Sequence, residues 1–121
     1  MIKTLIAAAS LAALASAAVA APASAVNGVL ATPAGATLYT FDKDVANSGK
    51  SACNGQCASN WPPLAAQASD AGSGDWSVVT RDDGSRQWAY KGSPLYTYAK
   101  DAKAGDTSGD GKGSVWHVIK N

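Results

Sequence analysis

Short stretches of alternating large and polar side chains mark the chain after residue 25, and no window there has the period of a helix. Leu38 to Phe41 and Leu95 to Tyr98 place aromatic rings at every second position, with leucine and threonine at the positions between, which is typical of half-buried strands. We expect further strands over residues 26–32 and 115–120. The pattern predicts an all-β protein.

A hairpin is predicted in the second half of the chain. Residues 76–81 and 86–91 both read as strands, and Asp82-Asp83-Gly84-Ser85 between them supplies turn-forming residues, as expected for two antiparallel strands joined by a short loop. Residues 65–71 are rich in alanine, so we expect a short helical turn there. The strands together predict a small antiparallel sheet domain.

The chain contains an internal duplication. Residues 35–44 match residues 92–101 without gaps at six of ten positions, and each segment is followed by a long polar loop that ends at Ser-x-Trp, at Trp61 and at Trp116. Matched landmarks in the same order indicate a repeat. We therefore expect one β domain over residues 26–121, built with pseudo-two-fold symmetry from repeats of about 27–64 and 76–120.

The first 20 residues have the layout of a secretory signal peptide. Lys3 precedes an Ala- and Leu-rich run that ends in small residues, and cleavage after Ala20 or after Ala25 fits the A-x-A rule. The apolar run is shorter than the roughly 20 residues that a bilayer requires, and no cysteine follows it as a lipid-anchor site. We expect a periplasmic or secreted protein without a membrane anchor.

The formal net charge of the chain argues against some classes of binding partner. Without Lys3 the chain keeps nine basic residues and nine acidic ones, all aspartate, so its formal net charge is zero. A neutral domain without a basic stripe argues against nucleic acid and anionic membranes as partners. His117 is the only histidine, and no nucleophile–base pair stands out, so we name no catalytic residue. The pattern favours a protein that is not an enzyme, and catalysis by exposed aspartate side chains is the alternative.

The first long loop carries the only two cysteines, Cys53 and Cys57. In an oxidising compartment such a pair usually forms a disulfide, and a ring this short would shape the loop more than stabilise the domain. A copper or thiol-redox site is the alternative, because soft thiolates select Cu(I), and His117 would be the natural third ligand.

The second long loop is rich in aspartate and glycine. Asp106 and Asp110 stand at a spacing like that at the start of a calcium loop, but position twelve is His117 rather than Glu. Turn formation is the simpler interpretation, and a weak calcium site is the alternative. No other cofactor is predicted.

These residues resemble a family of bacterial secreted or lipoprotein-type repeats of unknown function, which has a Y-x-[FWY]-x-x-D motif. The residues that carry the resemblance are Tyr39, Phe41 and Asp44 in the first repeat and Tyr96, Tyr98 and Asp101 in the second. The loop from Ser51 to Leu64 and the segment from Gly105 to Trp116 are also similar to the family. The resemblance implies the duplicated architecture and no particular reaction.

The sequence therefore predicts an exported cell-envelope protein that acts as a binding or interaction module for an envelope partner or a small ligand. The alternative is a periplasmic copper or thiol-redox protein that uses Cys53 and Cys57. Because the two long loops differ in chemistry while the strands before them are alike, we expect any site to lie in the loops.

Overall fold

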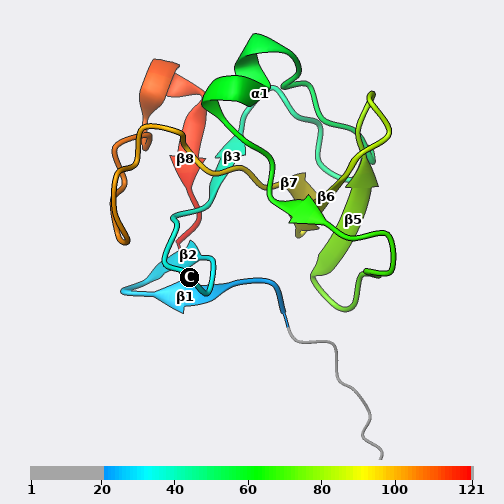
Figure 1. Cartoon of the computed structure of the whole chain (residues 1–121), viewed down its shortest axis with the longest axis horizontal. Helices are drawn as coiled ribbons and strands as arrows, with labels where there is room; N and C mark the ends of the chain where they lie inside the picture. The colour runs from blue at the N-terminus through cyan, green and yellow to red at the C-terminus, as the bar shows by residue number, and fades with distance from the viewer. Residues whose placement is uncertain (1–20, 121) are drawn as a thin grey trace, which may run out of the picture.

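The fold is known from a computed structural model, which describes residues 21–120. Over that range the chain forms short strands, one short helix and one 3-10 turn (Figure 1). Their bounds are β1 Ser24–Val26, β2 Val29–Ala31, β3 Tyr39–Phe41, α1 Gln56–Asn60, β4 Ala65–Ala66, β5 Trp76–Thr80, β6 Arg86–Tyr90, β7 Ser93–Pro94, the 3-10 turn Lys112–Ser114 and β8 Trp116–Val118. The expected signal peptide lies outside the described residues.

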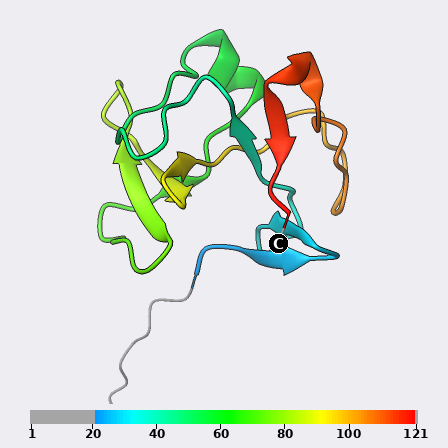
Figure 2. The same ribbon diagram turned by 180° about the vertical axis from the view of Figure 1, so that it is seen from behind.

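The strands form small antiparallel sheets. β1 pairs with β2, β3 pairs with β8, and β6 lies between β4 and β5 and also pairs with β7. The predicted all-β, antiparallel fold is confirmed, and so is the hairpin of β5 and β6 around the Asp82–Ser85 turn. In the view from behind, the β1–β2 hairpin and the end of the chain lie together at one edge (Figure 2). No helix within residues 21–120 is long and apolar enough to cross a membrane.

The single strand expected over residues 26–32 is wrong. Asn27 and Gly28 have positive φ angles of 53° and 81° and join β1 to β2 as a hairpin. Asn-Gly is the strongest short signal for this kind of turn, because both central residues must adopt positive φ.

The helical turn expected over residues 65–71 is also wrong. Ala65 and Ala66 form β4 and pair with Gln87 and Arg86 of β6. Alanine favours helix, but this preference is small and pairing with an available strand edge overrides it. The helix instead occurs at Gln56–Asn60, within the cysteine loop, which we define as residues 51–60. None of its residues is fully buried, so it has no apolar face for a periodicity search to detect.

The two halves meet at a pseudo-two-fold axis between Tyr39 and Tyr96. The backbone N–H of Tyr39 donates to the carbonyl of Tyr96 at 2.8 Å, and that of Tyr96 donates to the carbonyl of Tyr39 at 3.0 Å. Such a mutual exchange is the narrow pair of an antiparallel ladder. It relates the same position of the two repeats, which confirms the predicted duplication.

Each half then pairs with the end of the other. β3, from the first half, pairs with β8, from the second. In the equivalent place Tyr96 bridges Pro63, and the Thr97 N–H donates to the Pro62 carbonyl at 2.8 Å. The halves are therefore interlocked, and neither completes its own sheet.

Candidate functional site

The two halves share one arrangement of the tyrosines and aspartates of the repeated segment. The hydroxyl of Tyr39 donates to Asp101 at 2.6 Å, and the hydroxyl of Tyr96 donates to Asp44 at 2.6 Å. Both tyrosines are fully buried, and burial is the main reason that the pKa of each phenol lies well above its ordinary value. Each tyrosine thus bonds the aspartate of the other repeat.

The same aspartates hold the long loops. The other carboxylate oxygen of Asp44 accepts from the Ala52 N–H at 2.6 Å, and that of Asp101 accepts from the Ser108 N–H at 3.0 Å and from the Ser108 hydroxyl. A carboxylate that accepts backbone N–H bonds fixes the chain strongly, since hydrogen bonds to charged groups are the stronger ones. The repeated segment therefore positions both loops.

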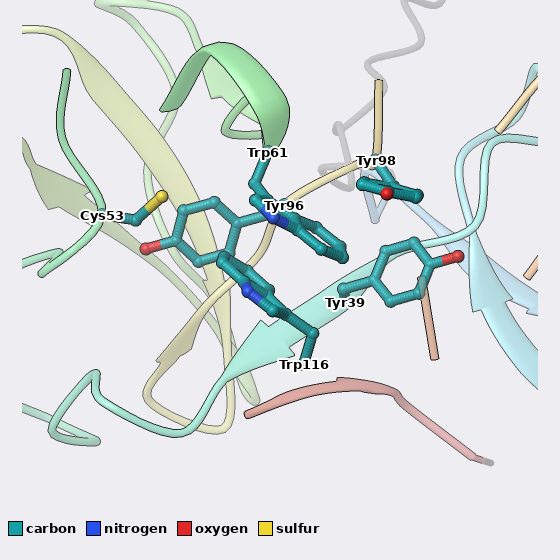
Figure 3. Close-up of a cluster of buried hydrophobic side chains, with 6 residues drawn as sticks. All are labelled: Tyr39, Cys53, Trp61, Tyr96, Tyr98 and Trp116. Carbon is teal, nitrogen blue, oxygen red and sulfur yellow. The ribbon is translucent and has the colours of Figure 1, made fainter. Parts of the chain in front are cut away.

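Aromatic rings fill the space between the two tyrosines (Figure 3). The indoles of Trp61 and Trp116 stack with centroids 3.8 Å apart and planes 4° apart, and the hydroxyls of Tyr39 and Tyr96 point to opposite sides of the cluster. Cys53 lies on the Tyr96 side. The Ser-x-Trp landmarks of the two repeats thus meet in one core.

The cysteine loop has a second anchor, Arg81, at the end of β5. Its side chain is buried, with 5% of the residue exposed. Nη1 donates to Ser51 Oγ at 3.0 Å and to Gln87 Oε1 at 2.7 Å, and Nη2 donates to the Cys53 carbonyl at 2.5 Å. Because breaking a buried, hydrogen-bonded charge is costly, Arg81 fixes the loop onto the β5–β6 hairpin.

These groups form a directed hydrogen-bond chain. Arg81 donates to Ser51, Ser51 lies 2.6 Å from the Tyr96 hydroxyl, and Tyr96 donates to Asp44. Burial raises the pKa of Asp44, while the bonds from Tyr96 and Ala52 and the charge of Arg81 oppose that rise. The chain joins a buried cation to a partly buried carboxylate through two hydroxyls.

The second half replaces this chain with a simpler arrangement. There the Gly109 N–H donates to the Tyr39 hydroxyl at 3.2 Å, and a Cβ at Gly109 would lie 2.6 Å from the Trp61 ring. The Ala52 N–H donates to Asp44 and the Ser108 N–H donates to Asp101. The residues that follow them, Cys53 and Gly109, therefore occupy equivalent places in the two halves. The elaborated half is therefore the one with the cysteines.

Cys53 and Cys57 form the expected disulfide, with an S–S distance of 2.04 Å. Cys53 is fully buried and Cys57 is partly buried against the aromatic core. The bridge closes a ring around Gly55, which has φ 57° and precedes α1. The disulfide, α1 and Arg81 together give the cysteine loop a fixed shape.

An open cavity of about 440 Å³ lies between the cysteine loop and the β5–β6 turn. We call it the cysteine-loop cavity; it is lined by Asn54, Gly55, Ala58, Pro63, Arg81, Asp82, Asp83 and Ser85. Asp82 and Asp83 are exposed at its rim. Hydrogen bonds from the Ser85 hydroxyl and N–H lower the pKa of Asp83, so that carboxylate is charged at neutral pH.

The other residues suggested as metal ligands, His117, Asp106 and Asp110, are hydrogen-bonded to groups outside the cysteine loop. His117 Nε2 lies 2.8 Å from Asp42 Oδ2, and both side chains are about half exposed. Asp106 accepts from the N–H groups of Ala102 and Lys103. Asp110 accepts from the Val118 N–H at 3.1 Å.

Within the described range no three His, Cys, Asp or Glu side chains gather as a metal site would require. Both cysteine sulfurs are bonded to each other. The copper and calcium sites therefore stay predictions from the sequence, and no geometry here adds to them.

Three residues of the site were not predicted from the sequence: Ser51, Arg81 and Gln87. Their signal is weak, because a lone arginine between a strand and a turn usually lies exposed. Gln87 is fully buried and also donates to the Leu95 carbonyl at 2.7 Å. Alternation along the predicted strand could not show this, because Gln87 and Trp88 point to opposite faces and both are buried.

The fold and site define a small duplicated β domain with interlocked halves and two loops of different chemistry. A family model described as a secreted repeat of unknown function matches residues 23–65 and again residues 77–120. The chain belongs to this family of secreted repeats, as its resemblance predicted. No curated protein and no solved structure shows a significant match.

Proposed function

We propose that this protein is a non-enzymatic binding module of the cell envelope and that the cysteine-loop cavity is its binding site. One observation carries the proposal. The cavity lies where the two halves differ, between the disulfide-bridged loop and the β5–β6 turn. Loops held on a rigid scaffold are where binding sites concentrate.

The cavity has the mixed lining of a ligand site. Ala58 and Pro63 supply apolar surface, and Asn54, Asp82 and Asp83 supply polar groups. Such a combination of apolar walls with a few placed polar groups is usual for small-molecule sites. Since the rim offers carboxylates, the lining suits a small polar ligand that brings hydrogen-bond donors or a positive charge.

Pre-organisation supports the proposal. Arg81 donates to Ser51, Gln87 and the Cys53 carbonyl, and at 3.4 Å to Asn54 Oδ1. Asn54 in turn donates to Asp82 at 3.4 Å, so hydrogen bonds already hold the wall and rim of the cavity. A wall that is already ordered lowers the entropic cost of binding.

The experiment is a ligand screen by NMR on the isotopically labelled chain, with mixtures of amines, amino acids, short peptides and glycan fragments. We expect shifts at the amides of Gly55, Ala58 and Asp83. Ala58→Trp fills the cavity and should abolish them. Ala102→Trp is the matched control, because Ala102 lines a separate cavity of about 280 Å³ and should leave them unchanged.

Two results would overturn the proposal. One is that binding occurs at other residues and survives Ala58→Trp. The other is steady turnover of esters, peptides or glycans that is lost on His117→Ala or Asp42→Asn. Fractionation of cells that express the full chain tests export to the periplasm or the medium, since recovery only in the cytoplasm would contradict it.

A further inference from the structure

Four aromatic rings form one continuous stack through the middle of the molecule. Tyr98 stacks on Trp61 at 4.1 Å, Trp61 on Trp116 at 3.8 Å, and Trp116 on Phe41 at 4.2 Å. The interplanar angles are 23°, 4° and 11° in the same order. Aromatic pairs prefer offset-stacked or edge-on contact at ring separations of about 4.5–7 Å, so this stack is unusually close.

The stack connects the interior to the surface. Its two indoles are buried, Phe41 at one end is only partly buried, and Tyr98 at the other end is 9% exposed. An indole loses an electron far more readily than the phenyl ring of Phe41, so an oxidant that reaches the stack would draw its electron from Trp61 or Trp116, whose rings lie parallel.

Each indole also touches a phenol that is bonded to a carboxylate. Tyr39 meets Trp61 edge-on at 5.3 Å, and Tyr96 meets Trp116 edge-on at 5.2 Å. Their hydroxyls lie 2.6 Å from Asp101 and Asp44. A base at this distance is placed to take a proton, and an oxidised phenol is a strong acid that must lose one.

The buried environment of Tyr39 and Tyr96 keeps the proton on each phenol until an electron is removed. Burial raises the pKa of both phenols, so each stays neutral at rest. Burial also raises the pKa of Asp44, which makes that carboxylate a better proton acceptor.

We propose that the stack and its two Tyr–Asp pairs form a redox site that takes oxidising equivalents from one-electron oxidants at the protein surface and holds them as a buried tyrosyl radical. The oxidant gains one electron and leaves an indole radical cation at Trp61 or Trp116. Tyr96 returns one electron to the indole and passes its phenolic proton to Asp44, or Tyr39 does so with Asp101. The products are the reduced oxidant, a neutral tyrosyl radical and a protonated aspartate. A one-electron donor such as ascorbate reverses the step.

This activity is independent of ligand binding in the cysteine-loop cavity. The probe is photogenerated tris(bipyridine)ruthenium(III), with transient absorption and electron paramagnetic resonance to follow indole and tyrosyl radicals. In the natural protein we expect the indole radical to decay into a tyrosyl radical, more slowly in D₂O than in H₂O. Asp83→Asn, a change at the rim of that cavity that adds no oxidisable ring, should not change this decay.

Three sets of variants distinguish the proposed redox site from the other aromatic residues. Asp44→Asn with Asp101→Asn keeps a hydrogen-bond acceptor but removes the base, and should slow tyrosyl formation on the order of 10²-fold, the usual contribution of a placed base. Tyr39→Phe with Tyr96→Phe should leave the radical on indole. Tyr90→Phe is the control, because Tyr90 packs on Trp76 outside the stack.

Tyrosyl formation at the natural rate in the asparagine pair, or an unchanged tyrosyl yield in the phenylalanine pair, would overturn the proposal. If the phenylalanine pair does not fold, the asparagine pair alone decides, provided that its circular dichroism matches the natural protein.

Discussion

Tyr39 and Tyr96 face each other across the pseudo-two-fold axis, and each backbone donates to the other at 2.8 and 3.0 Å. From this shared point their side chains leave in opposite directions (Figure 3), so that each hydroxyl reaches the aspartate of the other repeat. The tyrosine of each repeat is thus bonded to the aspartate of the other repeat. We call this reciprocal pair of Tyr–Asp hydrogen bonds the clasp.

The clasp predicts which residue pairs are energetically coupled. Double-mutant cycles of Tyr39→Phe with Asp101→Asn, measured by urea unfolding, should show coupling of about 0.5–3 kcal/mol. The reason is that removing a buried donor leaves the facing carboxylate without its partner. Tyr39→Phe with Asp44→Asn, two residues of one repeat, should be additive within about 0.5 kcal/mol. Strong coupling within the repeat and none between repeats would contradict the clasp.

Asp44 and Asp106 should give opposite pH dependences. Burial raises the pKa of Asp44 from its ordinary 3.8, so the folded state binds that proton more tightly than the unfolded state. The stability that Asp44 contributes relative to Asp44→Asn is therefore greatest below pH 3.8 and falls as the pH rises through the raised folded-state pKa. Urea unfolding at a series of pH values measures this difference.

For Asp106, the backbone N–H groups of Lys103 and Ala102 lower the pKa. Its contribution relative to Asp106→Asn is present above pH 3.8 and is lost as the pH falls through the lowered folded-state pKa. If the stability contributions of Asp44 and Asp106 change in the same direction with pH, the environment of one of these two carboxylates differs from the one described here.

Removal of the disulfide should lower stability modestly. Closing a ring of five residues is worth about 2 kcal/mol by the chain-entropy relation. We expect Cys53→Ala with Cys57→Ala to unfold at lower urea concentration by that amount and to keep the β-sheet circular dichroism. Reductant should produce a similar loss in the natural protein and none in the double variant. A collapse of the sheet signal would mean that the bridge is needed for the whole fold.

Gly109→Ala tests the packing between the halves. A Cβ there would lie 2.6 and 2.8 Å from two atoms of the Trp61 ring, and overpacking of this kind costs about 1–3 kcal/mol. We expect altered near-ultraviolet circular dichroism from the displaced indole. Gly111→Ala is the control: it meets open space but has φ 82°, so it should cost about 1–2 kcal/mol and leave the indole signal unchanged.

Much of the fold could be predicted from the sequence, because it depends on local signals. The β5–β6 hairpin follows from alternation around a strong turn, and the duplication follows from the match of residues 35–44 with 92–101. The β1–β2 hairpin was also predictable from Asn27-Gly28, although the apolar residues on both sides suggested one strand.

The site could be predicted only in part. Alternation shows that Tyr39 and Tyr96 are core strand residues, but the same pattern fits bonds within one repeat or between the two. Arg81 reaches the Cys53 carbonyl across 28 residues, and no local pattern reports such a contact. The helix at Gln56–Asn60 is shorter than two turns, so it carries no amphipathic period.

The linker between the halves, residues 67–75, has a consequence for how this architecture varies. Two separate copies of one repeat would have to find each other, whereas a short tether holds the halves at an effective concentration of order millimolar. In a homodimer every substitution occurs in both copies. In this single chain a substitution changes one half only, so the two halves need not stay symmetric. Arg81 and the disulfide are each present on one side of the axis, so one loop could acquire a specialised shape while its counterpart stayed a plain turn.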